Sequence, residues 1–468
     1  MKLAQLVDKH IGIVGLGVEG VSTATYFLEH SIPFSILDEK SEKELAGVGE
    51  AWSLLLKKCK KQHIPLLLGI PFTQEMVHGF DVLVRSPGIS LKADFLKGFK
   101  GTVTSHTKIF FDNCPGKIIG VTGTKGKGTT SSLIYEMLKK GGKDAYLGGN
   151  IGLPPLSFLD TVTAQSLVVL EMSSFQLQDL QVSPHISVML MVTQEHLDAY
   201  GNQNYHSSIK EYVDAKRNIV RFQTADDMAI LNTDYPATTE SATVTSAQIA
   251  WISRYRPVGT GCFVRDNEVI LKSNNQETKV IDVADVLLPG GHNLENVCAA
   301  TMAAYFAGVG LADIAFVLKT FKGLEHRLEL VREVESVRYY DDSFSTTPET
   351  AIAAIQAFTS PEILILGGSS KKSDFTELGK VIGEVPNIKA IIGIGMEWER
   401  IKAEFQISNL KFQIIENCKT MKQIVKAAKK LATPGDVVLL SPACASFDMF
   451  KNYKDRGNQF KQCVNELT

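Results

Sequence analysis

Short apolar runs alternate with segments of helical spacing over the first hundred residues. A glycine-containing turn at residues 15–20 separates the first apolar run from a helix pattern over Val21–Glu29. Parallel strands need crossover connections, so this alternation predicts a doubly wound sheet. A linker is expected near Lys100–Thr107. Strands are predicted at Ile11–Val14, Pro33–Leu37, Leu66–Leu68 and Val82–Val84.

Two further blocks show the same α/β pattern. The second opens with a strand at Lys117–Val121, which enters another glycine-rich turn and a helix over Thr129–Lys140, and the third begins near Gly323. Between them, residues 235–288 are rich in Thr, Ser, Val and Ile, which predicts strands and loops. Strands are also predicted at Leu167–Leu170, Ile186–Val192, Val337–Tyr340, Ile363–Leu366, Ala390–Ile394 and Val437–Leu440, and helices at Ser207–Val220, Asn296–Ala307, Pro348–Phe358 and the C-terminal end.

Length and composition limit the class of protein. At roughly 150 residues per domain, the 468 residues predict about three domains. The net charge of −2 argues against a nucleic-acid binder, whose domains normally carry a basic excess. No apolar run reaches the roughly 18 residues that a membrane span needs, and the N-terminal segment lacks a signal-peptide pattern. The seven cysteines contain no CxxC pair and predict free thiols in a reduced compartment. We therefore expect a cytoplasmic protein with no nucleic-acid and no membrane partner, and we expect a monomer.

The first glycine-rich turn has the context of a nucleotide-binding fingerprint. Gly15, Gly17 and Gly20 have the spacing GxGxxG between a strand and a helix, and Asp38 follows about 18 residues later. Such glycines permit a tight turn, and the helix N-terminus attracts a diphosphate. Asp38 could accept hydrogen bonds from a ribose or a base. The alternative is a turn that only packs a helix on a strand, and the motif does not specify the nucleotide.

The second turn, residues 120–130, is more specific. Its successive backbone N–H groups are expected to form an anion nest, and Lys127 can reach terminal phosphates. Gly128 directly follows Lys127, so the GxxxxGK[ST] pattern is not met, and Thr129 or Thr130 would have to supply the hydroxyl for Mg²⁺. A lysine-bearing surface loop is the alternative. Two phosphate-type loops on successive blocks predict one ATP and one nucleotide-bearing substrate.

Several segments together resemble the Mur ligases. The loop 123–129 (GTKGKGT) is similar to the phosphate loop of Mur ligases and of folylpolyglutamate synthases, and its Lys-Gly-Thr ending is closer to the latter. Segments 171–177 (EMSSFQL), 291–296 (GHNLEN) and 323–327 (GLEHR) resemble Mur ligases. Segments 366–375 (LGGSSKKSDF), 440–450 (LSPACASFDMF) and 456–460 (RGNQF) are similar to those of the family's D-glutamate-adding members. The resemblance covers nearly the full length.

The resemblance implies an α/β protein of three domains. A Rossmann-like domain at residues 1–106 would bind the UDP part of the substrate. A central domain of the P-loop ATPase type, residues 107–323, would bind ATP, and a Rossmann-like domain at residues 324–468 would bind glutamate. The implied ligase reaction uses ATP to add D-glutamate to UDP-N-acetylmuramoyl-L-alanine through an acyl phosphate. Its place would be cytoplasmic peptidoglycan precursor synthesis, on which cell shape and division depend.

The resemblance also assigns residues to the chemistry. Two anions approach each other when the substrate carboxylate attacks the γ-phosphate, so cations such as Lys127 and Mg²⁺ are needed. The implied metal ligands are Thr129, Glu171, His196 and Lys216, the last of these as a carbamate, which turns a cation into an anionic ligand. Lys127, Lys216, His196 and Glu171 are the implied catalytic residues. Without the resemblance, Glu171 would be a solvated or capping residue, His196 structural and Lys216 a surface charge.

Three sets of binding residues follow from the same resemblance. ATP is assigned to Gly123, Thr124, Lys125, Gly126, Lys127, Gly128, Thr129, Thr130, Asn293, Asn296, Arg327 and Asp342, with Asp342 near the ribose. The UDP-substrate is assigned to Gly15, Gly17, Val18, Glu19, Asp38, Gly88 and Asn150. Glutamate is assigned to Thr346, Lys371, Ser446, Phe447 and Tyr453, with Lys371 as the cation for a dicarboxylate. Helix capping is the alternative for Asn293 and Asn296.

The chain departs from the family's pattern at three of these positions and at Phe344, which lies near them in the sequence. Lys125 replaces an asparagine, Glu19 stands where a threonine is frequent, Phe344 replaces a lysine near the substrate carboxylates, and Tyr453 replaces the more usual phenylalanine. Phe344 puts acceptor affinity or pocket geometry in question, though not the class of reaction.

Other hypotheses about the function explain fewer of these sequence features. A folylpolyglutamate synthase fits the Lys-Gly-Thr ending, but those enzymes lack the N-terminal UDP domain that the first glycine turn indicates. An NAD-dependent oxidoreductase, inferred from that turn alone, leaves Lys127, Glu171 and the C-terminal segments without a role. A protein that binds the precursor without catalysis would release no phosphate. Protection against heat by ATP with Mg²⁺, but not by NADH, would separate the ligase from the oxidoreductase.

Overall fold

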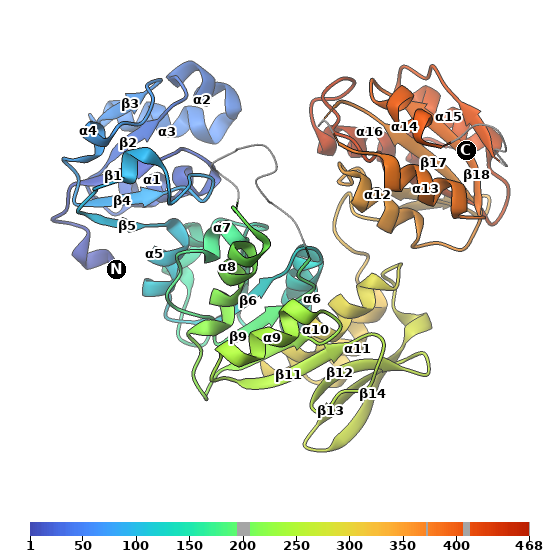
Figure 1. The fold of residues 1–468 in the computed structure, drawn as a ribbon, viewed down its shortest axis with the longest axis horizontal. Helices are drawn as coiled ribbons and strands as arrows, with labels where there is room; N and C mark the ends of the chain where they lie inside the picture. The colour runs from blue at the N-terminus through green and yellow to red at the C-terminus, as the bar shows by residue number, and fades with distance from the viewer. Residues whose placement is uncertain (194–205, 371–372, 406–411, 468) are drawn as a thin grey trace. The chain divides into compact units, whose positions relative to one another are not determined.

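The computed structural model describes residues 1–193, 206–370, 373–405 and 412–467. The chain forms two compact units, one of residues 1–283 with 295–317 and the other of residues 284–294 with 318–468. Two sheets lie in the first unit and one in the second, and helices pack around each sheet (Figure 1). The predicted α/β fold is therefore confirmed.

The N-terminal sheet is parallel, with strand order β3-β2-β1-β4-β5. β1 lies between β2 and β4, so the strand order reverses at its carboxyl end, where ligands bind in sheets of this type. All four residues of β1 are buried, as expected of a strand covered on both faces. The strands are β1 (Ile11–Val14), β2 (Ser35–Asp38), β3 (Leu66–Leu68), β4 (Val82–Arg85) and β5 (Thr102–Thr104), and the helices are α1 (Val18–Glu29), α2 (Glu42–Val48), α3 (Glu50–Lys61) and α4 (Gln74–Val77).

The predicted linker at residues 100–107 is wrong. Thr102–Thr104 form the edge strand β5, which pairs with β4, and helix α5 (His106–Asn113) begins two residues later. Ser105 caps this helix by accepting a hydrogen bond from the Lys108 N–H at 3.2 Å. A three-residue edge strand with a polar, partly exposed surface has no hydrophobic pattern to reveal it.

The central sheet has nine strands in the order β14-β13-β12-β11-β10-β9-β6-β8-β7. Its strands are parallel from β7 to β12, and β12, β13 and β14 form an antiparallel meander, which accounts for the strand-rich stretch near residues 235–288. The strands are β6 (Lys117–Thr122), β7 (Ala145–Gly149), β8 (Leu167–Glu171), β9 (Ile186–Met189), β10 (Met228–Asn232), β11 (Gln248–Ser253), β12 (Gly261–Arg265), β13 (Glu268–Ser273) and β14 (Gln276–Asp282). The helices are α6 (Lys127–Lys140), α7 (Ser174–Leu177), α8 (Ile209–Arg221), α9 (Pro236–Glu240), α10 (His292–Phe306) and α11 (Leu311–Thr320).

The third sheet has the order β15-β16-β20-β17-β18-β19, and only β15 runs antiparallel to its neighbour among these described strands. Along β17, Leu364 and Leu366 join one buried cluster and Ile363 and Ile365 the other, so both faces of the sheet are covered. The strands are β15 (Glu329–Val334), β16 (Val337–Asp341), β17 (Glu362–Gly367), β18 (Ile388–Ile394), β19 (Gln413–Ile415) and β20 (Val437–Leu440), and the helices are α12 (Pro348–Ile355), α13 (Thr376–Glu384), α14 (Trp398–Glu404), α15 (Met421–Leu431) and α16 (Tyr453–Asn465).

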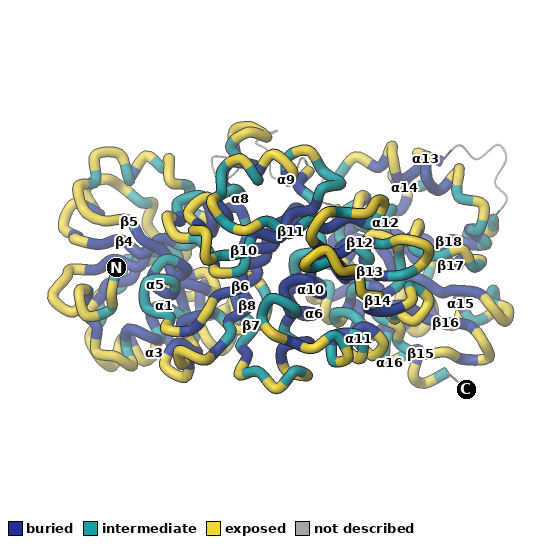
Figure 2. Tube along the Cα trace, turned by 90° about the horizontal axis from the view of Figure 1, so that it is seen from below, coloured by how far each residue is buried: buried dark blue, intermediate teal, exposed yellow. Residues whose placement is uncertain are grey.

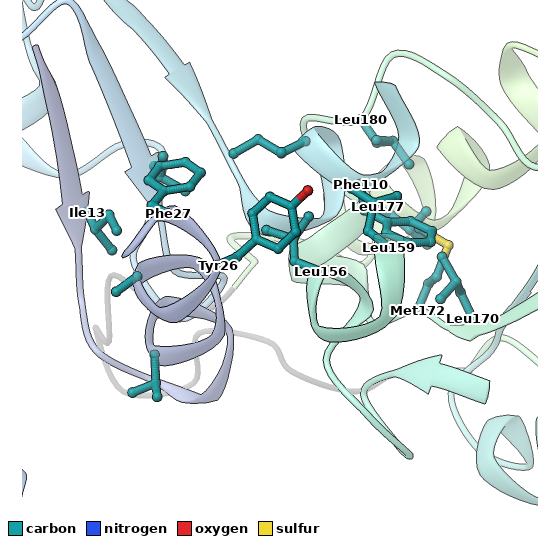
Figure 3. Close-up of a cluster of buried hydrophobic side chains, with 14 of the residues drawn as sticks. Ile13, Tyr26, Phe27, Phe110, Leu156, Leu159, Leu170, Met172, Leu177 and Leu180 are labelled. Carbon is teal, nitrogen blue, oxygen red and sulfur yellow. The ribbon is translucent and has the colours of Figure 1, made fainter. Parts of the chain in front are cut away.

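A single buried cluster joins the two sheets of the first unit. It runs from Ile13 and Phe27 beside the N-terminal sheet to Leu170 and Met172 beside the central sheet, with Tyr26 between them (Figure 3). The Tyr26 hydroxyl donates a hydrogen bond to Asp160 at 2.9 Å. Because apolar area is removed from water across this junction, the cluster fixes the first glycine turn relative to the central loops.

Buried residues concentrate in the inner strands of the sheets, and exposed residues in the surrounding segments (Figure 2). The edge strand β14 is an exception, because most of its residues are exposed. All seven cysteines are free thiols, and four of them are buried, as the sequence predicted. Within the described ranges, no helix is both long and apolar enough to cross a membrane.

Candidate active site

A cavity of about 670 Å³ lies at the carboxyl end of β1, in the first unit. Its walls come from the loops after β1, β2 and β4 and from two loops of the central sheet. All seven residues predicted to contact the UDP-substrate line this cavity: Gly15, Gly17, Val18, Glu19, Asp38, Gly88 and Asn150. The residues that line the cavity, from the glycine turn to Asn150, offer both backbone N–H groups and polar side chains to one ligand.

Close packing explains the glycines of the first turn. Gly15 has a φ of +85°, a conformation that disfavours other residues, and a Cβ at Gly20 would lie 2.1 Å from the Gly15 carbonyl oxygen. Asp38 holds the same turn, because its carboxylate accepts hydrogen bonds from the N–H groups of Leu16 at 2.6 Å and Lys40 at 2.8 Å. Asp38 therefore shapes the cavity wall, in addition to any contact that it makes with a ligand.

The second glycine turn connects β6 to α6. Gly126 has a φ of +83° and directly precedes the helix, so the first N–H groups of α6 face the loop. The Lys127 amine donates hydrogen bonds to the carbonyl oxygens of Gly123 at 3.1 Å and Thr124 at 2.9 Å. Lys127 is thus folded over the loop at the place where a phosphate nest is expected.

Asn296 packs against this loop from α10. Thr130 donates a hydrogen bond to the Asn296 side-chain oxygen at 3.2 Å, and a Cβ at Gly126 would lie 2.2 Å from the same oxygen. Helix α10 begins at His292, four residues before the predicted start, so Asn296 lies inside the helix. Capping, the alternative interpretation of Asn296, is therefore wrong.

Glu171 and Lys216 are both buried near the loop. Glu171, at the end of β8, is 3% exposed, and Asn150 donates a hydrogen bond to its Oε1 at 3.1 Å. Its Oε2 has no hydrogen-bond partner in the described part of the chain. A buried carboxylate oxygen without a donor is costly unless a cation binds it, and hard oxygen ligands suit Mg²⁺. Glu171 therefore fits the role of a metal ligand, and its burial excludes the alternative hypothesis of a solvated carboxylate.

Lys216, on α8, is 2% exposed, so the interpretation of this residue as a surface charge is wrong. Its amine donates a hydrogen bond to the Gly123 carbonyl oxygen at 2.8 Å and lies 4.6 Å from the centre of the Tyr212 ring. The helix thereby brings a lysine from 93 positions along the chain to the phosphate loop.

In the second unit, Arg327 and Phe344 form a pair. The Arg327 guanidinium lies over the Phe344 ring, 3.8 Å from its centre, and the ring meets Tyr453 edge-on with centroids 5.2 Å apart. A cation is attracted to the face of an aromatic ring. Phe344, which replaces the family's lysine, therefore helps to orient an arginine that the sequence assigned to ATP.

Asp342 is buried in the second unit, and its carboxylate is hydrogen-bonded to other residues of the protein. Its carboxylate accepts hydrogen bonds from the Leu328 N–H at 3.1 Å, from Ser441 at 2.7 Å and from Ser345. Burial raises the pKa of Asp342 to about 7. The residue connects three segments that meet at the carboxyl ends of β16 and β20.

The described residues that were assigned to glutamate lie in the segments that follow β16 and β20, at the same edge of the third sheet. Ser446 and Phe447 follow β20, Thr346 precedes α12, and Tyr453 begins α16. Phe447 is 72% exposed, and its N–H donates to the Ser369 hydroxyl at 3.0 Å. The Phe447 side chain is therefore available to a ligand at the carboxyl ends of the strands, whereas the Ser446 side chain is buried.

Arg456 is a residue whose role sequence reasoning missed. It is fully buried on α16, and its guanidinium donates to the Ser343 hydroxyl at 2.9 Å, the Ser343 carbonyl at 2.9 Å, the Cys444 carbonyl at 3.1 Å and the Ala445 carbonyl at 3.3 Å. These bonds hold the loops after β16 and β20 together. The segment 456–460 stood out only through its resemblance, and no local pattern indicates that this arginine turns inward.

Comparison with known proteins agrees with this arrangement of sheets and loops. Three family models match: the Mur ligase MurD-like N-terminal domain over residues 9–102, the Mur ligase middle domain over 121–304 and the Mur ligase glutamate ligase domain over 326–444. A UDP-N-acetylmuramoylalanine–D-glutamate ligase of Acetivibrio thermocellus is 37% identical, with 99% of this chain and 97% of that protein covered. The chain belongs to the Mur ligase family.

Other known proteins have similar sequences or folds. A protein of the same name from Thermoanaerobacter sp. is 34% identical, with 99% of each chain covered. The structure of UDP-N-acetylmuramate-alanine ligase MurC from Thermotoga maritima has a TM-score of 0.59 at 15% identity, with 98% of this chain and 99% of that chain covered. A pseudomurein peptide ligase type C from Methanothermus fervidus has a TM-score of 0.57 at 16% identity, with 98% and 100% covered. At these identities the structural likenesses show the fold.

Some of the residues expected to act in this Mur ligase are not placed. His196, expected on the metal, and Lys371, expected on glutamate, lie outside the described residues. The residues assigned to ATP divide between the units, with the phosphate loop and Asn296 in the first and Asn293, Arg327 and Asp342 in the second. Asn293 donates a hydrogen bond from its side chain to the Pro289 carbonyl at 2.6 Å.

Proposed function

We propose that this Mur ligase adds D-glutamate to UDP-N-acetylmuramoyl-L-alanine, using ATP and Mg²⁺, in peptidoglycan precursor synthesis. The proposal rests chiefly on one observation, the meeting of Lys127, Lys216 and the Gly123 carbonyl at a glycine-rich loop between β6 and α6. Relatives named UDP-N-acetylmuramoylalanine–D-glutamate ligase, similar over almost the whole chain, support the choice of substrates. We retain the division into domains at residues 1–106, 107–323 and 324–468.

The phosphate and acyl chemistry is assigned to the first unit. The backbone N–H groups of the loop and the Lys127 ammonium would neutralise charge on the γ-phosphate when the alanine carboxylate attacks it. Lys127 would exchange its present bonds to the loop carbonyls for bonds to phosphate oxygens. As the carboxylate oxygen bonds to the γ-phosphorus, the bond to the bridging oxygen breaks and ADP leaves. The glutamate amine then attacks the acyl phosphate, and phosphate leaves the tetrahedral intermediate.

Metal binding is assigned to Glu171, Thr129, His196 and Lys216. Mg²⁺, when bound, would polarise phosphoryl oxygens and lower the repulsion between the two reacting anions. The free Oε2 of Glu171 is the buried oxygen that supports this assignment. We propose that Lys216 is carbamylated, because its amine lies buried beside a phosphate loop, where a carbamate would contribute an anionic ligand.

Recognition of the acceptor is assigned to the second unit. Thr346, Ser446 and Phe447 lie on loops at the carboxyl edge of the third sheet, and Tyr453 begins α16. Lys371 would add a cation for the dicarboxylate. Arg456 positions two of these loops without being exposed to a ligand. The pairing of Phe344 with Arg327 supports a role for Phe344 in orienting that arginine.

The deciding experiment is phosphate release with ATP, Mg²⁺ and UDP-N-acetylmuramoyl-L-alanine in the presence of D-glutamate, L-glutamate or no amino acid. We expect release with D-glutamate alone. Release with L-glutamate would preserve the mechanism but change the acceptor. No release with either acceptor, combined with activity on a folate, would contradict the proposal and favour a folylpolyglutamate synthase.

A further inference from the structure

Glu19 is a buried carboxylic acid in the wall of the cavity that we assign to the UDP-substrate. It lies in the first turn of α1, directly after Gly17 and Val18, and lines the same cavity as they do. Only 9% of its surface is exposed. A helix N-terminus favours an anion, so the first turn of α1 is where a substrate diphosphate would be bound. Glu19 therefore places a titratable acid beside the expected position of a diphosphate.

One oxygen of the Glu19 carboxyl group has a partner and the other has none. Gln176, on α7, donates a hydrogen bond from its side-chain amide to Oε1. Oε2 is buried and has no hydrogen-bond partner in the described part of the chain. Gln176 in turn accepts a hydrogen bond from the Ser173 N–H at 2.8 Å, and both of these residues line the cavity. The unpartnered oxygen has the chemistry to carry a proton and to donate it to an acceptor.

Arg85 and Asp179 are the charged groups that act on Glu19, and both also bond to other groups, although the Arg85 Nε and the Asp179 Oδ2 have no hydrogen-bond partner in the described part of the chain. Arg85 donates to the carbonyl oxygens of Ser86, Pro87 and Ile89 and pairs with Asp179 at 3.4 Å, and it makes no described hydrogen bond with Glu19. Burial raises the pKa of Glu19 to about 7. The hydrogen bond from Gln176 and the charge of Arg85 lower this pKa by smaller amounts, and the charge of Asp179 raises it slightly.

Other titratable groups near the helix do not share this behaviour. His106, on α5, contacts α1 through a hydrogen bond between its Nδ1 and the Thr23 hydroxyl at 3.0 Å. Burial lowers the pKa of His106 to about 3, so this residue is neutral near pH 7. Asp38, Glu39 and Lys40 line the cavity from the loop after β2, and Asp38 is held by two backbone N–H groups. Glu19 is thus the acid that combines burial, a free oxygen and a place on the helix turn.

We propose that Glu19 binds the diphosphate of the UDP-substrate in its protonated form, so that each substrate bound near neutral pH brings one proton into the protein. An ionised Glu19 would repel the diphosphate in a poorly solvated site, whereas a protonated one donates an O–H···O–P hydrogen bond. This inference rests on the proposed function, because it takes the cavity to be the UDP-substrate site. It adds a substrate-recognition role and a pH dependence that the reaction itself does not require.

The linkage between proton and substrate has a definite sign. In the free protein, Glu19 is half-ionised at about pH 7, while the bound protein retains the proton to a higher pH. Between these two values, the apparent Kd for the substrate rises about tenfold for each pH unit, because one proton must be bound together with the ligand. Below pH 6 the apparent Kd no longer depends on this group.

Calorimetric titration of the full-length protein with UDP-N-acetylmuramoyl-L-alanine, without ATP, measures this proton directly. Repeating the titration at pH 8 in buffers of different ionisation enthalpy gives the number of protons taken up for each ligand bound. The diphosphate of this ligand is a diester without a group that titrates near pH 7, unlike UDP, whose terminal phosphate has a pKa of about 6. We expect uptake approaching one proton in the wild-type protein.

Two variants of the same helix separate the source of the proton. Glu19→Gln keeps the side-chain shape and an acceptor for Gln176 but cannot titrate, so uptake should fall to near zero and the apparent Kd should become flat from pH 6 to 9. Glu29→Gln makes the same chemical change at an exposed position of α1 and should retain the uptake.

Tight wild-type binding without proton uptake would overturn the inference, and so would uptake that persists in Glu19→Gln. Either result leaves the proposed function intact if D-glutamate-dependent phosphate release is still observed. No binding of the ligand and no phosphate release would overturn both.

Discussion

Gly126→Ala tests whether the phosphate loop depends on the packing of Asn296. The left-handed backbone at Gly126 costs a residue with a Cβ about 1–2 kcal/mol. The added Cβ would also lie 2.2 Å from the Asn296 oxygen, so this side chain must move and lose its hydrogen bond from Thr130. A hydrogen bond of this kind contributes about 0.5–1.5 kcal/mol, and together the two effects predict a loss of about 2–3 kcal/mol in the free energy of unfolding.

Gly142→Ala is the matched control. Gly142 lies just beyond the other end of α6, has a φ of +70° and has no atom within 4 Å of the position that a Cβ would occupy. It should therefore lose only the backbone part, about 1–2 kcal/mol. The variant pair isolates the contact with Asn296, since both substitutions have the same backbone and unfolded-state effects.

Two measurements check the prediction. Urea unfolding should show that Gly126→Ala is less stable than Gly142→Ala by about 1 kcal/mol, and ATP with Mg²⁺ should raise the melting temperature of Gly142→Ala but not of Gly126→Ala. The double variant Gly126→Ala/Asn296→Ala should lose less stability than the sum of the losses in the two single variants, because the close approach between the new Cβ and the Asn296 oxygen is then absent. Equal stabilities of the two alanine variants, with equal protection by ATP, would refute the reasoning.

Four other substitutions have expected outcomes. Lys127→Ala should abolish phosphate release while the UDP-substrate still binds, and unchanged turnover in a phosphate assay would exclude the phosphate-loop role. Lys216→Ala should lose activity and regain part of it with a short-chain carboxylic acid, whereas full activity without the acid would contradict the carbamate. Burial raises the pKa of Glu362 to about 8 from 4.5, so the folded protein holds a proton that the unfolded chain has released. Between pH 5 and 8, the free energy of unfolding in urea should therefore fall with rising pH more steeply in the wild type than in Glu362→Gln, by about 1.4 kcal/mol for each pH unit. Parallel pH profiles of the two proteins would disprove this. Arg456→Lys keeps the charge but cannot reproduce four hydrogen bonds to two loops, so urea unfolding should show a loss of about 3 kcal/mol; a loss below the error would refute its bracing role.

Much of the local structure was predictable because its signals are local. The strand at Ile11–Val14 and the turn after it are encoded by an apolar run and by glycine spacing within ten residues. The same holds for the second turn and for β20. β5 shows the limit, because only pairing with β4 makes a strand of three residues whose own pattern resembles a linker.

The candidate site was predictable in part. Residues within the glycine turns could be named, since the turn itself presents them to a ligand. The functions of other residues came from resemblance to a family, because Glu171 and Lys216 in isolation look like a strand-end carboxylate and a surface lysine. Their burial became apparent only with the sheet and helix that enclose them.

By itself, the sequence determined the alternation of strands and helices at many places along the chain and the two glycine-rich turns, because these depend on neighbours a few residues apart. The tertiary structure decided which distant groups meet: Lys216 with Gly123, Arg456 with Ser343, and Glu19 with Gln176. Such contacts depend on strand order and on the packing of helices against sheets. Hydrophobic periodicity shows which face of an element is buried, but it does not show which partner that face will meet.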